Sequence, residues 1–231
     1  MDRGVYKSFS ETMRMSSFKI ILALKAGYYI FLCAFLLDCS DAFQATRTDR
    51  PEDNLPLLFC WPAPGCERRT EKGERLACKL NVGMQGRIDA TRLFNDRLIM
   101  LLSKANCIRS LWDPQTFTYH NSPTTGTDAS LMDTLTGIKG LQDSEPQQPP
   151  IGWCFMGWHV DDSTAVACDV QHELDAKKNR VVAFIQGTIE TVYATTMTGW
   201  HGNKSLGFLL ELDDKAMKVH MSAPDALAQL G

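Results

Sequence analysis

Apolar side chains run almost unbroken through residues 20–37, a length that suits either a membrane span or a buried core segment. Lys25 lies inside the run, and a Gly-Tyr-Tyr sequence at residues 27–29 divides it. Residues 16–26 have apolar positions at helical spacing, whereas residues 30–37 have the length of a fully buried strand. We therefore expect a short helix, a turn and a buried strand, with a membrane-spanning segment as the alternative.

Periodic apolar positions predict two further helices, and strand-like runs separated by turn residues predict two hairpins and two shorter strands. The helices are expected at residues 87–104 and 170–193, the hairpins at 151–168 and 206–221, and the shorter strands at 76–80 and 112–120. Small and polar residues dominate residues 121–150, which we expect to form a long polar loop. Because strands and helices do not alternate regularly, the expected fold class is α+β, an open antiparallel sheet backed by helices.

Composition narrows the class of protein further. The chain has 231 residues, of which 44% are hydrophobic and 22% charged, and this excludes a disordered chain, a collagen and a coiled-coil rod. Residues 68–109 carry ten Lys/Arg against four Asp/Glu, a net +6, whereas residues 151–231 carry six against ten, a net −4. This division suits a protein that binds a polyanion with one part and metal cations with another, although two solvated faces would also explain it.

The eight cysteines form neither a Cys-x-x-Cys pair nor a zinc-finger pattern with histidines. Several of them lie in or beside apolar runs, where a free cysteine packs as a small hydrophobic residue. We interpret them as reduced thiols of a reducing compartment, with a disulfide framework as the less favoured alternative.

Two adjacent carboxylates, Asp161 and Asp162, lie at the predicted turn of hairpin 151–168. Like charges repel, and apolar surroundings disfavour ionised groups, so a divalent cation would relieve both costs. The alternative is a plain exposed turn, which is how we interpret the same dipeptide, Asp213-Asp214, in the second hairpin.

Asp38 ends the predicted buried strand and is a third candidate ligand. If that strand lies beside hairpin 151–168, Asp38 and Asp161 could hold two metal ions ~3.5–4 Å apart, the spacing used in nucleotidyl transfer. The alternative is that Asp38 caps the next turn, and Asp41 is assigned only that role.

The order of these features resembles the reverse transcriptase of copia-type LTR retrotransposons. Residues 37–43 (LDCSDAF) look like motif A, residues 85–95 like motif B, and residues 160–162 like motif C. The other similar segments are residues 6–19, leading out of the fingers, residues 61–67 and 77–80, matching the Pro-x-Gly-Phe and Cys-Lys-Leu segment, and residues 206–208, matching the primer grip.

This resemblance implies a polymerase palm. Asp38 and Asp161 would bind two Mg²⁺ ions, for which Mn²⁺ could substitute, and Asp162 would be the third carboxylate. The resemblance makes residues 1–231 one palm-type domain with the fingers and thumb largely missing. The alternatives are a non-enzymatic, membrane-anchored protein and a metal-dependent nuclease.

The resemblance also implies substrate-binding residues. The backbone at Cys39 and Ser40 would lie near the triphosphate, Phe43 would exclude a ribose 2′-hydroxyl, Gln85 and Gly86 would pack against the template–nucleotide pair, and His159, where the family usually has Tyr, would touch the primer end. Asp89 departs from the family pattern, which has Gln there.

The implied partners are an RNA template, a DNA primer, deoxynucleoside triphosphates and the remaining polyprotein with its integrase and RNase H. Basic residues within 68–109 would contact backbone phosphates. The expected location is cytoplasmic, in a virus-like particle, or nuclear, without secretion or stable membrane association.

Overall fold

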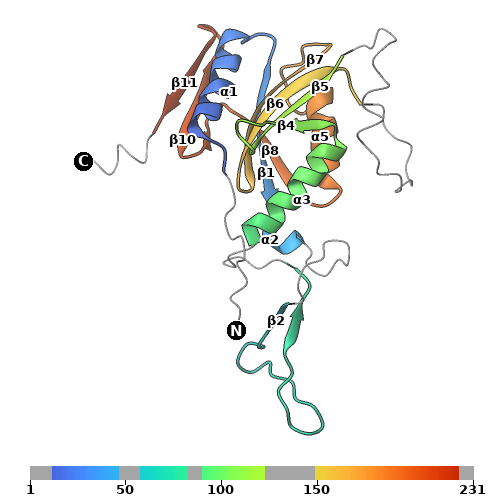
Figure 1. Ribbon diagram of the computed structural model, residues 1–231. Coiled ribbons are helices and arrows are strands. Elements are labelled where there is room, and N and C mark those ends of the chain that lie inside the picture. The colour runs from blue at the N-terminus through green and yellow to red at the C-terminus, as the bar shows by residue number, and fades with distance from the viewer. Residues whose placement is uncertain (1–11, 47–57, 83–89, 123–148, 224–231) are drawn as a thin grey trace, which may run out of the picture.

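The computed structural model describes residues 12–46, 58–82, 90–122 and 149–223. Its centre is a six-stranded antiparallel sheet in the order β4-β5-β6-β7-β1-β8 (Figure 1). These strands are β1 (Cys33–Ser40), β4 (Cys107–Arg109), β5 (Thr116–Asn121), β6 (Gly152–His159), β7 (Asp162–Asp169) and β8 (Ala194–Gly199). The predicted α+β class and the hairpin within residues 151–168 are confirmed.

One face of this sheet packs against helices α3 (Ala90–Lys104) and α5 (Arg180–Glu190). Side chains alternate between the two faces of a strand, so every second residue of β1 points toward these helices. Those residues of β1 are Cys33, Phe35, Leu37 and Cys39, all of them buried in the core cluster that includes Phe94 and Ile185. The short helix α2 (Ala42–Ala45) follows β1 directly.

The opposite face is covered in part by helix α1 (Met15–Gly27) and by a three-stranded sheet. The strands of this sheet are β9 (Asn203–Ser205), β10 (Phe208–Asp213) and β11 (Lys218–Ser222). Phe18 of α1 and Leu210 of β10 belong to the same buried cluster as Ala34 and Val166 of the large sheet. Trp200 Nε1 donates to the carbonyl of Phe35 at 3.1 Å, which anchors the start of this covering layer.

The apolar run at residues 20–37 divides between two elements, as predicted. Its first part completes α1, and its second part enters β1, although β1 starts at Cys33 and extends past Asp38 to Ser40. Lys25 Nζ donates to the carbonyls of Tyr29 and Leu32, at 2.7 and 2.8 Å, and so stabilises the turn between them. Within the described ranges, no helix is long and apolar enough to span a membrane.

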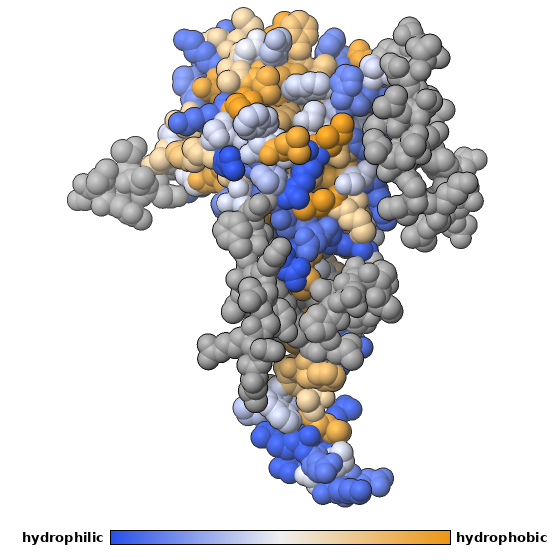
Figure 2. All heavy atoms as spheres, viewed as in Figure 1, coloured by the Kyte–Doolittle hydropathy of each residue, from blue (hydrophilic) through white to orange (hydrophobic). Residues whose placement is uncertain are grey.

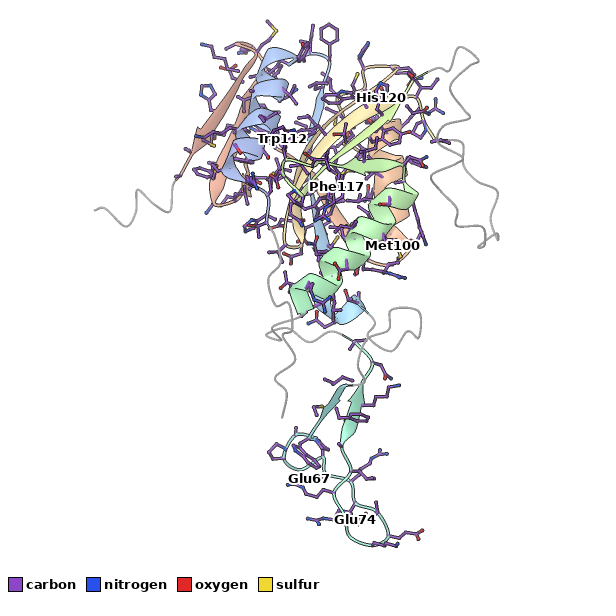
Figure 3. All side chains as sticks on the ribbon, viewed as in Figure 1. Glu67, Glu74, Met100, Trp112, Phe117 and His120 are labelled. Carbon is purple, nitrogen blue, oxygen red and sulfur yellow. The ribbon has the colours of Figure 1, made fainter. Side chains whose placement is uncertain are left out.

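A separate two-stranded hairpin, which we call the arm, comprises β2 (Leu58–Cys60), β3 (Cys78–Leu80) and the residues between them. It extends away from the large sheet (Figure 1). Figure 2 shows that hydrophilic side chains cover its far end, which carries Glu67 and Glu74 (Figure 3). The strand predicted at residues 76–80 is confirmed as β3, which is shorter because it begins at Cys78.

The structure corrects two further element boundaries. Helix α5 starts at Arg180 rather than near residue 170, because the Asp169 carboxylate accepts from the amides of Gln171, Glu173 and Arg180 and holds the preceding residues in turns. Strand β5 starts at Thr116 rather than Trp112, because residues 113–116 form a turn in which the Thr116 amide donates a hydrogen bond to the Asp113 carbonyl.

Candidate active site

The antiparallel pairing of β1 with β7 places Asp38 directly opposite Asp162. Residues opposite one another in such a pair point to the same face, with Cβ atoms roughly 4.5–5.5 Å apart. The pairing of β6 with β7 places His159 opposite Asp162 on its other side. All three side chains therefore point away from helices α3 and α5, toward the face that α1 and β9–β11 cover only in part.

Asp161 belongs to the tight turn that joins β6 to β7. The turn is fixed to β1 because the Cys39 amide donates to the Asp161 carbonyl at 3.0 Å. Val160, the other residue between the paired His159 and Asp162, has φ of 60°. This conformation is costly for a β-branched residue and persists only where its surroundings impose it.

The three carboxylates create an excess of negative charge. Partial burial raises the pKa of Asp162 to about 6, assisted by its hydrogen bond with Asp38 and by the charges of Asp161 and Asp38. A cation at this position would remove the repulsion that disfavours ionisation of the pair.

A cavity of about 210 Å³ opens beside the pair. Asp38, Asp162, Thr196 and Thr198 line it from the large sheet, and Asn203 and Lys204 line it from β9. Strand β9 is held against β7 by a hydrogen bond between the buried hydroxyls of Thr164 and Ser205. The cavity thus combines two carboxylates with one cationic side chain.

The donor chemistry fits Mg²⁺, which commonly takes one or two protein carboxylates and fills its other positions with water and substrate phosphates. Asp38 and Asp162 supply these carboxylates, and Asp161 adds charge within the same turn. In the described part of the chain, no group of three or more His, Cys, Asp and Glu side chains is arranged to hold an ion as a complete set. Water and substrate phosphates commonly supply the remaining ligands of such an ion.

The other predicted site residues have different positions. Cys39 is 1% exposed, and its side chain faces the helices, where burial raises the pKa of its thiol to about 12. Its amide donates to the Asp161 carbonyl, and the expected place of the Cys39 and Ser40 backbone near a triphosphate stays a prediction. Ser40 is the half-buried last residue of β1.

Phe43 lies in α2, partly buried, with its ring edge-on to Phe94 of α3 at a centroid distance of 6.2 Å. His159 is half-buried, and its Nδ1 is buried without a hydrogen-bond partner among the described residues. Gln85 and Gly86 lie outside the described residues, as does Asp89.

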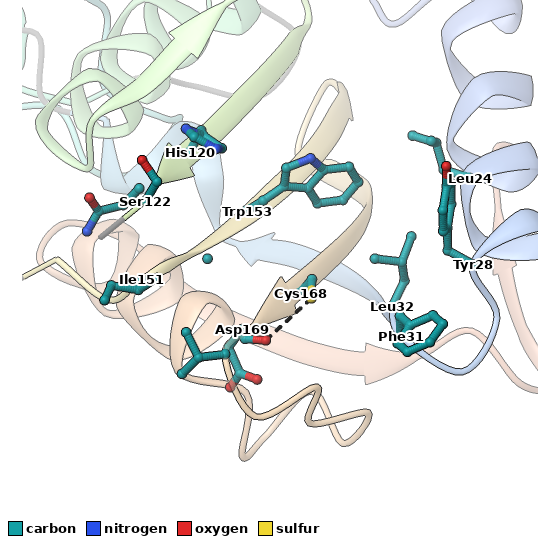
Figure 4. A pocket seen from close by; sticks show the side chains of 13 residues that line it. Leu24, Tyr28, Phe31, Leu32, His120, Ser122, Ile151, Trp153, Cys168 and Asp169 are labelled. Carbon is teal, nitrogen blue, oxygen red and sulfur yellow. Dashed lines mark hydrogen bonds between the residues drawn. The ribbon is translucent and has the colours of Figure 1, made fainter. Parts of the chain in front are cut away.

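A larger cavity lies elsewhere among the described residues. Its volume is about 530 Å³, and its lining is mainly apolar, including Tyr28, Phe31 and Trp153 (Figure 4). It lies at the start of β6 and the end of β7, whereas Asp161 joins their other ends. A functional site chosen by cavity volume alone would therefore be this apolar cavity and not the carboxylate cavity.

Sequence reasoning missed Lys204, Asn203 and Thr196. Thr196 lies on β8, which the sequence pattern does not predict, and the other two lie on the short strand β9. They join the site only because distant strands pair, and no local signal in the sequence marks them.

A scan against models of known protein families finds no match to this chain, and a search of curated proteins finds no significant match either.

Proposed function

We propose that this chain acts as the palm of an RNA-directed DNA polymerase of the copia-type retrotransposon class. The observation that carries the proposal is the convergence of Asp38 with Asp161 and Asp162, which are 123 and 124 positions apart from it by numbering (161 − 38 and 162 − 38). A buried strand and a tight hairpin bring these carboxylates to one end of an antiparallel sheet backed by two helices.

In the proposed reaction, Asp38 and Asp162, which line the cavity beside β9, would hold two magnesium ions together with Asp161 of the adjoining turn. When bound, such ions lower the pKa of a primer 3′-hydroxyl and neutralise charge on the triphosphate and the leaving pyrophosphate. Lys204, which also lines this cavity, would attract a phosphate group through its positive charge. We propose that His159, which lies opposite Asp162, contacts the primer end, whereas the contact of Phe43 with the sugar stays a prediction.

Primer extension tests the proposal. The chain, completed with the fingers and thumb of a copia-type reverse transcriptase, is incubated with an RNA template, an annealed DNA primer, deoxynucleoside triphosphates and Mg²⁺, and Asp161→Asn is compared with the wild type. We expect wild-type extension, and at least a ~100-fold loss in the variant, because metal ligation contributes several kcal/mol to such transition states.

Asp213→Asn is the matched control. Asp213 is likewise the first residue of an Asp-Asp dipeptide, but in the β10–β11 hairpin. Its Oδ1 accepts from the amides of Lys215 and Ala216, a role that an asparagine oxygen can also perform. We expect wild-type extension from this variant. Equal extension by the wild type and Asp161→Asn would contradict the proposal, and Mg²⁺-dependent strand cleavage without extension would favour a nuclease instead.

A further inference from the structure

Two cysteines face each other across the arm. Cys60 ends β2 and Cys78 begins β3, and the two are directly opposite in the antiparallel pairing. Opposite residues have Cβ atoms roughly 4.5–5.5 Å apart on one face. A disulfide requires a Cβ separation of about 3.5–4.5 Å, so a shift of about 1 Å suffices to reach bonding geometry.

Oxidants can reach the Cys60–Cys78 pair more readily than the cysteines that are buried in the core. Cys60 is half-buried and Cys78 is exposed, and both thiols are free. By contrast, Cys33, Cys107 and Cys154 are buried in the core, where burial raises the pKa of each thiol. Access, which helps to govern oxidation, therefore favours the arm, and the raised pKa values further disfavour oxidation of the core thiols.

The local structure gives such a bond a clear effect. The pairing of β2 with β3 ends at Cys60 and Cys78. Nearer the tip, the Leu76 amide donates to the Arg68 carbonyl and the Arg75 guanidinium lies over the Trp61 ring. None of the side chains described between residues 59 and 82 is buried. An isolated two-stranded hairpin without a core is marginally stable, so a covalent link at its last pair would fix its register.

We propose that Cys60 and Cys78 form a redox modification site, an intramolecular disulfide made by exchange with a small disulfide such as oxidised glutathione. The exposed Cys78 thiol loses its proton, and the thiolate attacks one sulfur of the oxidant, which releases one glutathione thiol. The Cys60 thiolate then attacks the mixed disulfide and releases the second. Two protein thiols are oxidised by two electrons, and one glutathione disulfide is reduced to two thiols.

Equilibration of the full chain in glutathione redox buffers tests this site. Free thiols are alkylated, and the protein is digested without reduction and analysed by mass spectrometry. We expect a peptide pair linked through Cys60 and Cys78, with a mass loss of about 2 Da for the two hydrogens removed, and its disappearance after reduction.

Cys66→Ser is the matched control, because Cys66 is exposed in the same arm but is opposite neither cysteine. This variant should form the link as the wild type does, whereas Cys60→Ser and Cys78→Ser should not. A link that involves Cys66, mixed glutathione adducts alone, or no link in the most oxidising buffer would overturn the proposal. The wild-type digest decides the matter even if a variant folds poorly.

Discussion

Lys25 is a buried cation with a structural task. It is 3% exposed, and its Nζ serves two backbone carbonyls at the turn between α1 and β1. Burial lowers the pKa of Lys25, so the folded protein disfavours the charge that these carbonyls partly compensate. The position of Lys25 inside the apolar run is visible in the sequence, but its partners depend on a turn that only the tertiary structure shows.

We expect Lys25→Met to lower the free energy of unfolding by about 1–3 kcal/mol, because Met fills the space but leaves two buried carbonyls unpaired. Urea denaturation measures the change, and Lys19→Met, at an exposed position of the same helix, should stay within about 0.5 kcal/mol of the wild type.

The lowered pKa of Lys25 also predicts a pH dependence. The stability of the wild type should rise as the pH rises toward 10.5, because Lys25 then holds its proton longer in the unfolded chain than in the folded one, and Lys25→Met should not show this rise. Equal stability of Lys25→Met and the wild type would refute the role.

Val160 makes the β6–β7 turn a strained element. Since glycine adopts positive φ without steric cost, we expect Val160→Gly to raise the free energy of unfolding by about 1 kcal/mol, measured by urea denaturation. Val170→Gly is the control, because Val170 is exposed and is not among the residues with positive φ, so the same exchange should destabilise by up to about 1 kcal/mol. Destabilisation by both exchanges would argue against strain in the turn.

Asn179 decides where α5 begins. Its Oδ1 accepts from the amides of Val181 and Val182 at 3.1 and 3.2 Å, and its Nδ2 donates to the Glu173 carbonyl. We expect Asn179→Ala to cost about 1–2 kcal/mol in thermal or urea unfolding. Asn179→Ser, which retains a capping oxygen, should recover part of this loss, and an alanine variant as stable as the wild type would refute the cap.

These elements show how far sequence patterns reach. The α1 helix, the β6–β7 hairpin and most of α3 follow from apolar periodicity, because each buries one continuous face. The predicted helix at residues 170–193 was too long, since Asp169 and Asn179 hold its first part in turns through hydrogen bonds that periodicity does not encode. Strand β8 escaped prediction because its residues are mostly exposed at the edge of the sheet.

In the molecule as a whole, the carboxylate site and the larger cavity lie at opposite ends of the β6–β7 hairpin. One end of β6–β7 carries the carboxylates, and the other borders the large apolar cavity. The sequence predicted that Asp38 would meet the 161/162 turn, and the strand pairing brings them together. The sequence could not predict that the Cys39 amide would donate to the Asp161 carbonyl of that turn, nor that Lys204 of β9 would line the carboxylate cavity.

The proposed function depends on these carboxylates acting together as one cation site. The direct measurement is a titration of the full chain with Mn²⁺, followed by electron paramagnetic resonance of the free ion. We expect saturable binding that Asp38→Asn and Asp162→Asn each weaken at least about tenfold, a loss of about 1.4 kcal/mol, and that Asp213→Asn leaves unchanged. Absence of saturable binding to the wild type, or equal affinity in all four proteins, would contradict the account.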